Sequence, residues 1–369
     1  MSGAKSILLF AIVISLVAGA AQGKYSGGTG EPNDPYRIAT AEDLNDIGNY
    51  EEDWSKNFIL VNDVNLAQYT GTQFKIIGND SFPFTGVFDG NGHRICNFTY
   101  EADAADYVGL FGYISDPNAE VKNIELIDPN INALLWVGSL VGYLEHGTII
   151  DCCVDGGTIS GLGSVGGLVG ENNGSITVSS SSASVSGGGP LGGLVGVNAE
   201  GTITNCWSSG SISGSQGIGG LAGASSSAGI ISNCYSTATV SGSVVVAGLV
   251  GFGHSRITKC YAAGPTYGVS VVGGLVAIGA TEQVVDSYWD VNTSGQTTSA
   301  GGVGKTTAEM KTSATFTDAG WDFVEIWDIG ENQTYPFLRT EPAGDSNHDK
   351  KVDLSDLAIL SSHWLEDPP

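Results

Sequence analysis

The sequence predicts an all-β protein, a parallel β-solenoid of about seven coils of 26–30 residues with a capping segment at each end. The first observation is a short motif, seen as VGGLVGEN at residues 165–172, that occurs in seven copies. Its leucine falls at positions 110, 140, 168, 194, 221, 249 and 275. A near-constant period of this length is the signature of a repeat architecture. The second observation is that the repeats lack helical apolar spacing and are rich in Val, Ile, Ser, Thr and Gly, which favours short strands joined by turns.

A second block follows each leucine and explains how one coil bends. It reads ITNCWSSG at 203–210 and ISNCYSTA at 231–238, with degenerate copies elsewhere. Ile203 and Cys206 are three residues apart, so a straight strand cannot point both inward. A left-handed bend at Asn205 resolves the conflict, since Asn tolerates that conformation. The same column holds Asn123, Asp151, Asn233, Lys259 and Asp286. Amides stacked along it could bond to one another.

The two blocks together resemble the GLUG repeat of bacterial extracellular proteins. G-G-L-V-G followed by I-T-N-C-W or I-S-N-C-Y carries the resemblance, which covers about residues 106–290. It implies a secreted or surface-exposed β-rich protein, in some members with an adhesive role. The repeat is not known to carry a catalytic residue, so the resemblance assigns none here.

The N-terminus and the charge restrict where the protein works. Lys5 precedes an apolar run from Ile7 to Val17 and then small residues, so residues 1–23 are predicted to be a secretory signal peptide. No later stretch is apolar and long enough to span a bilayer, and the mature chain is expected to have no membrane span. The net charge of −25 argues against binding nucleic acid or anionic membrane. We therefore expect a secreted, extracellular or cell-surface protein.

The flanks of the repeats are predicted to cap the solenoid. Residues 24–105 are read as an N-terminal cap with the first coils, including a helix that starts at Thr40 and strands near residues 58–61, 75–77 and 86–88. Residues 291–343 are read as a C-terminal cap, with a helix start at Thr306. The aromatic run within residues 320–338 is expected to pack on the last coils.

The C-terminal segment, residues 344–369, carries the sharpest chemical motif. Its oxygen donors have the spacing of an EF-hand calcium loop, and the predicted ligands are Asp345, Asn347, Asp349, the Lys351 carbonyl, Asp353 and Asp356. The segment resembles one half of a type I dockerin, which implies calcium as the cofactor and a cohesin-like protein as the partner. Lys350 stands where the loop usually has Gly, and there is one such repeat where dockerins usually have two.

Two columns of the repeat suggest further roles. Trp207, Tyr235, Tyr261 and Tyr288 follow the cysteine column and would form an aromatic stripe on successive coils. Such a stripe could contact a glycan; the alternative is that the rings stack on one another or lie under a loop. Cys152, Cys206, Cys234 and Cys260 are predicted to form a ladder of buried thiols without disulfides, because side chains in register point in parallel.

The repeats offer little for catalysis. From Val154 to Ser255 the charged residues are Asp155, Glu171 and Glu200, whereas a solenoid lyase or hydrolase needs clustered carboxylates or a carboxylate with Arg or Lys. Asp89 and His93 lie in a predicted turn and are read as structural. AGGVGKTT at 300–307 lacks the first glycine and the preceding strand of a phosphate loop. The sequence favours a scaffold or adhesion protein; the rival reading is a polysaccharide-degrading component of an extracellular complex, reached through the dockerin-like tail.

Overall fold

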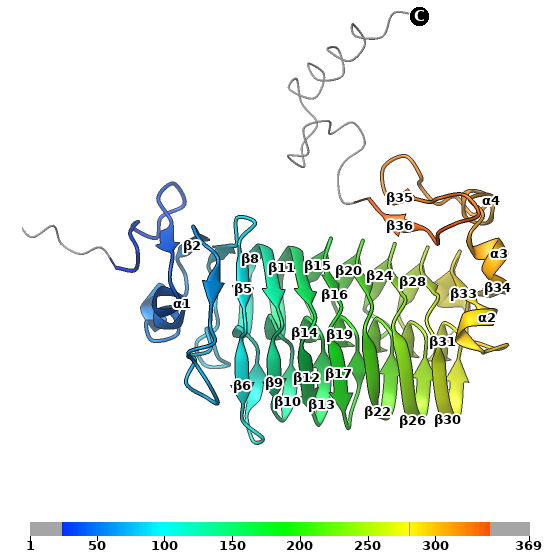
Figure 1. The fold of residues 1–369 in the computed structure, drawn as a ribbon, viewed down its shortest axis with the longest axis horizontal. Helices are drawn as coiled ribbons and strands as arrows, with labels where there is room; N and C mark the ends of the chain where they lie inside the picture. The colour runs from blue at the N-terminus through cyan, green and yellow to red at the C-terminus, as the bar shows by residue number, and fades with distance from the viewer. Residues whose placement is uncertain (1–23, 280, 340–369) are drawn as a thin grey trace, which may run out of the picture.

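The computed structural model describes residues 24–279 and 281–339 and shows a parallel β-solenoid of about nine turns. The coils stack along one axis, with α1 at one end and the helices α2, α3 and α4 at the other (Figure 1). The predicted fold class is therefore confirmed, and the count of seven coils is too low. The extra turns come from residues 24–105, where β1 (Tyr36–Ile38), β2 (Asn57–Leu60) and β4 (Val87–Asp89) pair in parallel ahead of the repeats.

One large sheet contains the strands that follow the recurring leucine and those that flank the bend. After the leucine come β14 (Val169–Asn172), β19 (Val195–Asn198), β23 (Ala222–Ser225), β27 (Val250–Gly253) and β31 (Val276–Gly279). Before the bend lie β15 (Ser175–Thr177), β20 (Thr202–Thr204), β24 (Ile230–Ser232), β28 (Arg256–Thr258) and β32 (Val284–Val285). After the bend lie β3 (Val64–Asn65), β5 (Arg94–Cys96), β16 (Ser180–Ser181), β21 (Trp207–Ser208), β25 (Tyr235–Ser236), β29 (Tyr261–Ala262), β33 (Tyr288–Asp290) and β34 (Val303–Lys305). The long strands β8 (Phe111–Ile127) and β11 (Val141–Asp155) run through all three lines.

A second sheet forms the remaining side of the coils. Its strands are β6 (Thr99–Glu101), β7 (Asp106–Val108), β9 (Asn130–Asn132), β10 (Leu135–Val137), β12 (Thr158–Gly161), β13 (Gly163–Gly166), β17 (Ser184–Gly187), β18 (Leu191–Gly192), β22 (Ser211–Gly219), β26 (Thr239–Ala247) and β30 (Thr266–Gly273). A separate antiparallel pair, β35 (Trp327–Asp328) and β36 (Phe337–Leu338), lies beside the rim of the solenoid (Figure 1).

The bend predicted in each coil is present. Asn123, Asp151, Asn205, Asn233, Lys259 and Asp286 all have φ between +49° and +56°, and so does Val178 at +50°. The axial amide bonds, however, form in another column: Asn172 Nδ2 donates to Asn198 Oδ1 at 2.7 Å, and Asn198 Nδ2 donates to Ser225 Oγ at 3.2 Å. Asn205 Oδ1 is buried without a hydrogen-bond partner.

The recurring glycines serve the close stacking of the coils. A Cβ atom on Gly167 would lie 2.2 Å from the Gly193 carbonyl oxygen of the next coil, and one on Gly193 would lie 2.3 Å from the Gly220 carbonyl oxygen. A Cβ atom would clash at these two positions, which favours Gly there. One copy has Ser139 instead, and its buried hydroxyl donates to the Gly167 carbonyl oxygen at 2.5 Å. The leucine beside each of these glycines is fully buried in the core.

The capping segments follow the sequence predictions with one exception. α1 (Ala41–Ile47) starts with a capping box between Thr40 and Asp43, and α3 (Thr307–Met310) starts with one between Thr306 and Glu309. The described residues also form α2 (Val291–Ser294), α4 (Ala314–Thr317) and two short 3₁₀ turns, η1 (Glu51–Asp53) and η2 (Thr281–Gln283). The strand predicted at residues 75–77 is absent; Ile77 makes a single bridge with Phe111. None of the helices in the described part of the chain has the length and apolar character needed to cross a bilayer.

Candidate functional site

One line of side chains runs along the outside of the coils just after the bend. Strand pairing places its members in register, each on the next coil, and we call this line the outer column. From the N-terminal end it consists of Arg94, Glu125, Cys153, Ser180, Trp207, Tyr235, Tyr261 and Tyr288. Its first half is polar or small, and its second half is aromatic.

The aromatic half forms the stripe that the spacing predicts, and its rings stack. The Trp207 and Tyr235 rings lie 6.0 Å apart with 9° between their planes, and the Tyr235 and Tyr261 rings lie 5.0 Å apart with 2° between theirs. Burial raises the pKa of the Tyr235 hydroxyl to about 12. The stacking uses the ring faces that a sugar would otherwise contact.

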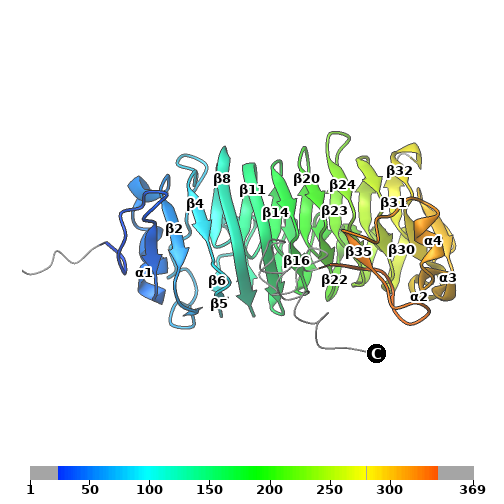
Figure 2. The same ribbon diagram turned by 90° about the horizontal axis from the view of Figure 1, so that it is seen from above.

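The C-terminal segment covers the end of this stripe. Trp321 and Trp327 pack on Tyr261, and the Tyr261 hydroxyl donates to the Pro336 carbonyl oxygen at 2.6 Å. Seen from above, β35 lies over the C-terminal coils (Figure 2). Tyr261 is 1% exposed and Tyr288 is 8% exposed. The cap therefore covers these two rings, which is the alternative that the sequence left open for the stripe; Trp207 and Tyr235 remain half-buried.

Two cavities lie along the polar half of the outer column. The first, of about 420 Å³, is lined by Asn91, Gly92, Asn123, Ile124, Glu125, Asp151 and Cys153. The second, of about 280 Å³, shares Asp151 and Cys153 with the first and extends to Trp207. Its far wall comes from the C-terminal segment, through Glu325, Ile326, Leu338 and Arg339. The outer column thus passes from an open groove into a stack that the cap covers.

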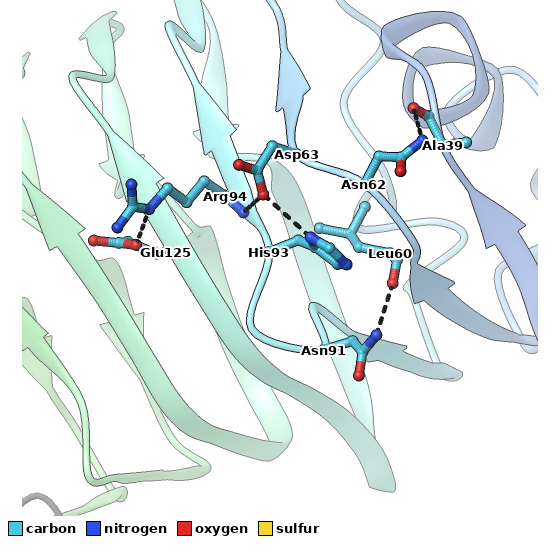
Figure 3. A network of polar contacts seen from close by, with 8 residues as sticks. All are labelled: Ala39, Leu60, Asn62, Asp63, Asn91, His93, Arg94 and Glu125. Atoms are coloured by element: carbon cyan, nitrogen blue, oxygen red, sulfur yellow. Dashed lines mark hydrogen bonds and ion pairs between the residues drawn. The ribbon is translucent and has the colours of Figure 1, made fainter.

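A polar network beside the first cavity accounts for His93. The His93 Nδ1 and Asp63 Oδ1 atoms lie 3.1 Å apart, and Asp63 also accepts from the Arg94 backbone N–H at 3.0 Å (Figure 3). The Arg94 backbone N–H and the His93 ring hold the pKa of the Asp63 carboxyl below its usual range. Arg94 Nε donates to Glu125 at 2.5 Å. These contacts tie neighbouring coils together, which is the structural role predicted for His93.

Asp89, the other residue singled out in this turn, has separate partners. Its Oδ1 atom accepts from the Asn91 backbone N–H at 2.8 Å and from Asn123 Nδ2 at 2.9 Å. The Asn123 bond joins two coils at the bend. Asp89 therefore also stabilises the turn, as the sequence predicts.

A second aromatic cluster was missed in the sequence. Tyr107 and Trp136 stack at 4.6 Å with 4° between planes, and Tyr113 and Tyr143 stack at 4.9 Å on the adjoining strand line. Trp136 Nε1 donates to Glu171 Oε2 at 2.7 Å, and burial raises the pKa of this carboxyl. The two rings of each stacked pair are one repeat apart in the sequence. Tyr107 and Tyr113 lie on either side of Leu110, and Trp136 and Tyr143 lie on either side of Leu140. This spacing could have predicted the cluster.

The cysteine ladder is present. Cys152, Cys206, Cys234 and Cys260 are buried and form no disulfide. Burial raises the pKa values of the Cys152 and Cys234 thiols. Each of the four thiols lies near the carbonyl oxygen two residues before it, as Cys234 does with Ser232 O at 3.1 Å. Ser179 and Ser287 replace cysteine in this column and make the same local bond.

Two further motifs of the sequence remain, the phosphate-loop-like segment at 300–307 and the predicted calcium loop. Residues 303–305 of AGGVGKTT form β34, which pairs with β33. Within residues 24–279 and 281–339, no three His, Cys, Asp or Glu side chains are grouped as a metal site. The predicted calcium ligands Asp345, Asn347, Asp349, Lys351, Asp353 and Asp356 lie outside the described residues, as does the signal peptide. The calcium site therefore stays a prediction.

Comparison with known proteins places the repeat and the fold. Residues 214–241 match the GLUG motif. Halomucin of Haloquadratum walsbyi is 34% identical over 164 residues, which are 42% of this chain and 2% of that protein. A "Putative Gly-rich membrane protein" of Evansella cellulosilytica is 34% identical over 137 residues, 36% of this chain and 16% of that protein. The chain thus spans a small part of either relative.

A solved structure shares the fold. A "putative immunoglobulin A1 protease" from Bacteroides ovatus superposes with a TM-score of 0.58 at 21% sequence identity, over 87% of this chain and 97% of that one. At this identity the likeness shows the solenoid architecture alone. The chain is a β-solenoid that contains a GLUG motif at residues 214–241.

Proposed function

We propose that this protein is an extracellular or cell-surface solenoid that binds and scaffolds rather than reacts. The observation that carries the proposal is the outer column, where a groove adjoins an aromatic stack. Grooves that combine an aromatic side chain with a few polar groups are suited to holding a ligand. The predicted signal peptide and the surface-type names of the two relatives support an extracellular place of action.

The tail is the second part of the proposal. Residues 345–356 offer the hard oxygen donors that calcium prefers, in the order of an EF-hand loop. Calcium bound at this loop would support docking to a cohesin-like partner on another protein.

Binding is tested by sedimentation with insoluble polysaccharides in calcium-containing buffer. We expect the protein to be retained on at least one polymer. The matched control is the variant Ser180→Tyr, which fills the groove beside Trp207. Retention on no polymer would contradict a glycan-binding role and leave a protein partner for the tail as the remaining interaction.

Calcium binding is tested by calorimetry on the full chain. Titration of the parent should release or absorb heat at one site, and the double variant Asp345→Ala with Asp356→Ala should lose it, because both substitutions remove carboxylate ligands. A parent protein that shows no calcium heat would refute the EF-hand assignment.

Polysaccharide degradation is the second candidate. The dockerin-like tail favours it, since the resemblance implies delivery to an extracellular complex. The repeats oppose it, because residues 154–255 carry three acidic side chains and no Lys or Arg. A catalytic pair would have to come from outside residues 154–255. In the N-terminal coils Asp63, Asp89 and Glu125 already have structural partners, whereas the second cavity brings Asp151, Glu325 and Arg339 together.

A further inference from the structure

Trp207 is the first ring of the aromatic stack, and among residues 24–279 and 281–339 one of its faces has no ring neighbour. Tyr235 of the next coil stacks on one face. In the preceding coil the in-register residue is Ser180, and in the coil before that it is Cys153. Neither can cover an indole. The cavity of about 280 Å³ lies at this step in the outer column, with Trp207, Ser180 and Cys153 among its walls.

The opposite wall supplies polar groups that are held in place. Arg339 Nε donates to the Trp327 carbonyl oxygen at 3.1 Å, and Arg339 Nη2 donates to the Phe323 carbonyl oxygen at 3.3 Å. Its guanidinium also lies 3.4 Å from Asp328 Oδ2. Glu325 lines the same wall. Because these contacts anchor Arg339, the wall keeps its shape without a ligand.

The wall on the solenoid side adds acceptors. Asp151 and Asn205 both line the cavity. The Asn205 Oδ1 atom is buried and lacks a hydrogen-bond partner, although burying an acceptor unpaired costs free energy. If the Asn205 side-chain amide rotated toward the cavity, its Oδ1 atom could accept a hydrogen bond from a ligand hydroxyl. The cavity therefore combines an aromatic face with carboxylates, an amide and a guanidinium.

These groups select one class of ligand. A sugar ring has a C–H face that packs on an aromatic ring and hydroxyls that bond at its edge to carboxylate, amide and guanidinium groups. Two acids and one base give the site no excess of positive charge, which favours a neutral sugar over an acidic one. Ligand cavities usually span roughly 300–1,000 Å³, so this one suits a single ring rather than a length of chain.

We propose that the cavity between Trp207 and the C-terminal segment binds one neutral pyranose ring, as a terminal or branching unit of a glycan. The inference rests on the proposed binding function and narrows it. The proposed glycan contact is then one face of Trp207 rather than all four rings of the stripe. The covered rings Tyr261 and Tyr288 pack against the C-terminal segment that forms the opposite wall. The C-terminal segment thus takes part in the site that it helps to close.

Saturation-transfer NMR on the full protein tests the proposal. The probes are the methyl glycosides of glucose, galactose and mannose. We expect saturation of the C–H protons of at least one probe, loss of the signal in Trp207→Ala, and its retention in Trp207→Phe, which keeps an aromatic face. The matched control is Trp136→Ala in the other aromatic cluster, which should bind as the parent does. No transfer to any probe, or transfer that survives in Trp207→Ala, would overturn the proposal.

A second variant separates blocked binding from lost folding. Ser180→Tyr adds a ring in register with Trp207 at a column position that holds aromatic residues in four later coils. We expect a folded protein that no longer binds the probe. Ser184→Tyr, on an exposed position of the other sheet, should bind normally. Polymer retention that persists in Ser180→Tyr would leave the proposed function intact and refute this site.

Discussion

The two halves of the outer column have the same backbone conformation but differ in the contacts that their side chains make. In the first half, Glu125, Cys153 and Ser180 line open cavities. In the second half, Tyr235 and Tyr261 stack and the C-terminal segment packs over them. The strand register and the left-handed bend are the same in both. The repeat therefore determines where a side chain stands, and the residue at that place determines whether the coil binds a cap or faces a groove.

The aromatic half should depend on Trp327 more than on any other single side chain of the cap. Trp327 is fully buried, 4.6 Å from the Trp321 ring and in contact with Tyr235 and Tyr261. Replacing it with Ala should cost about 3–5 kcal/mol of cap stability. Denaturant unfolding, followed by hydrogen exchange in residues 314–339, measures the loss.

Trp327→Phe is the control for this prediction. The Trp327 Nε1 atom is buried without a partner, so Phe keeps most of the packing and removes an unpaired donor. Its cost should be well below that of Ala. Equal stability of the Ala variant and the parent would mean that the cap does not depend on this stack.

Alkaline pH should lower the stability of the protein next, in part through the aromatic half; burial also raises the pKa values of the Tyr25 and Tyr113 hydroxyls toward the N-terminal end. Burial raises the pKa values of the Tyr235 and Tyr335 hydroxyls to about 12, whereas an unfolded tyrosine ionises near pH 10, as a rough reference. Their contribution to stability is complete below about pH 10 and is lost as the pH rises through about 12, because only the unfolded state releases the proton early. Unfolding free energies at pH 8, 10 and 11.5 check this. In the Tyr235→Phe variant the unfolding free energy should decrease less between pH 8 and 11.5. An unchanged decrease would mean that Tyr235 is not its cause.

The smallest effect tests the shared backbone. Val178 stands in the column of Asn205 and Asn233 with φ at +50°, although a β-branched residue is strained there. Its side chain is 43% exposed, so little packing is lost on replacement. Val178→Asn should stabilise the protein by about 1 kcal/mol, and Asn233→Val should destabilise it by a similar amount. Thermal unfolding measures both, and a destabilising Val178→Asn would contradict the bend assignment.

Much of the fold could be predicted because equivalent positions recur in successive coils, so a pattern seen in one coil can be checked in the next. Seven leucines at a near-constant spacing predict stacked coils, and the Ile203–Cys206 spacing predicts the bend at Asn205. The coils before residue 106 were undercounted because their strands lack the recurring leucine. The axial amide bonds were placed in the wrong column, because the bend aims each side chain in a way that the sequence pattern does not reveal.

The candidate site was harder to predict, since it depends on contacts outside the repeat. The aromatic run within residues 320–338 was expected to pack on the last coils, and it does, but the spacing of Tyr261 does not indicate that Trp321 and Trp327, about 60 residues later, cover this ring. The aromatic stripe could be predicted from the sequence, but which of its rings remains partly exposed could not. The cavity beside Trp207 arises where a repeat with Ser180 meets a segment that has no repeat, and only the three-dimensional fold brings these together.

The central claim is that the protein binds rather than cleaves. The most direct test incubates the purified mature protein with insoluble polysaccharides in calcium and records both retention and the release of reducing ends. The account predicts retention on at least one polymer without release of sugar. Release of reducing ends, abolished by a change in the N-terminal coils such as Glu125→Gln, would contradict it and identify the protein as an enzyme.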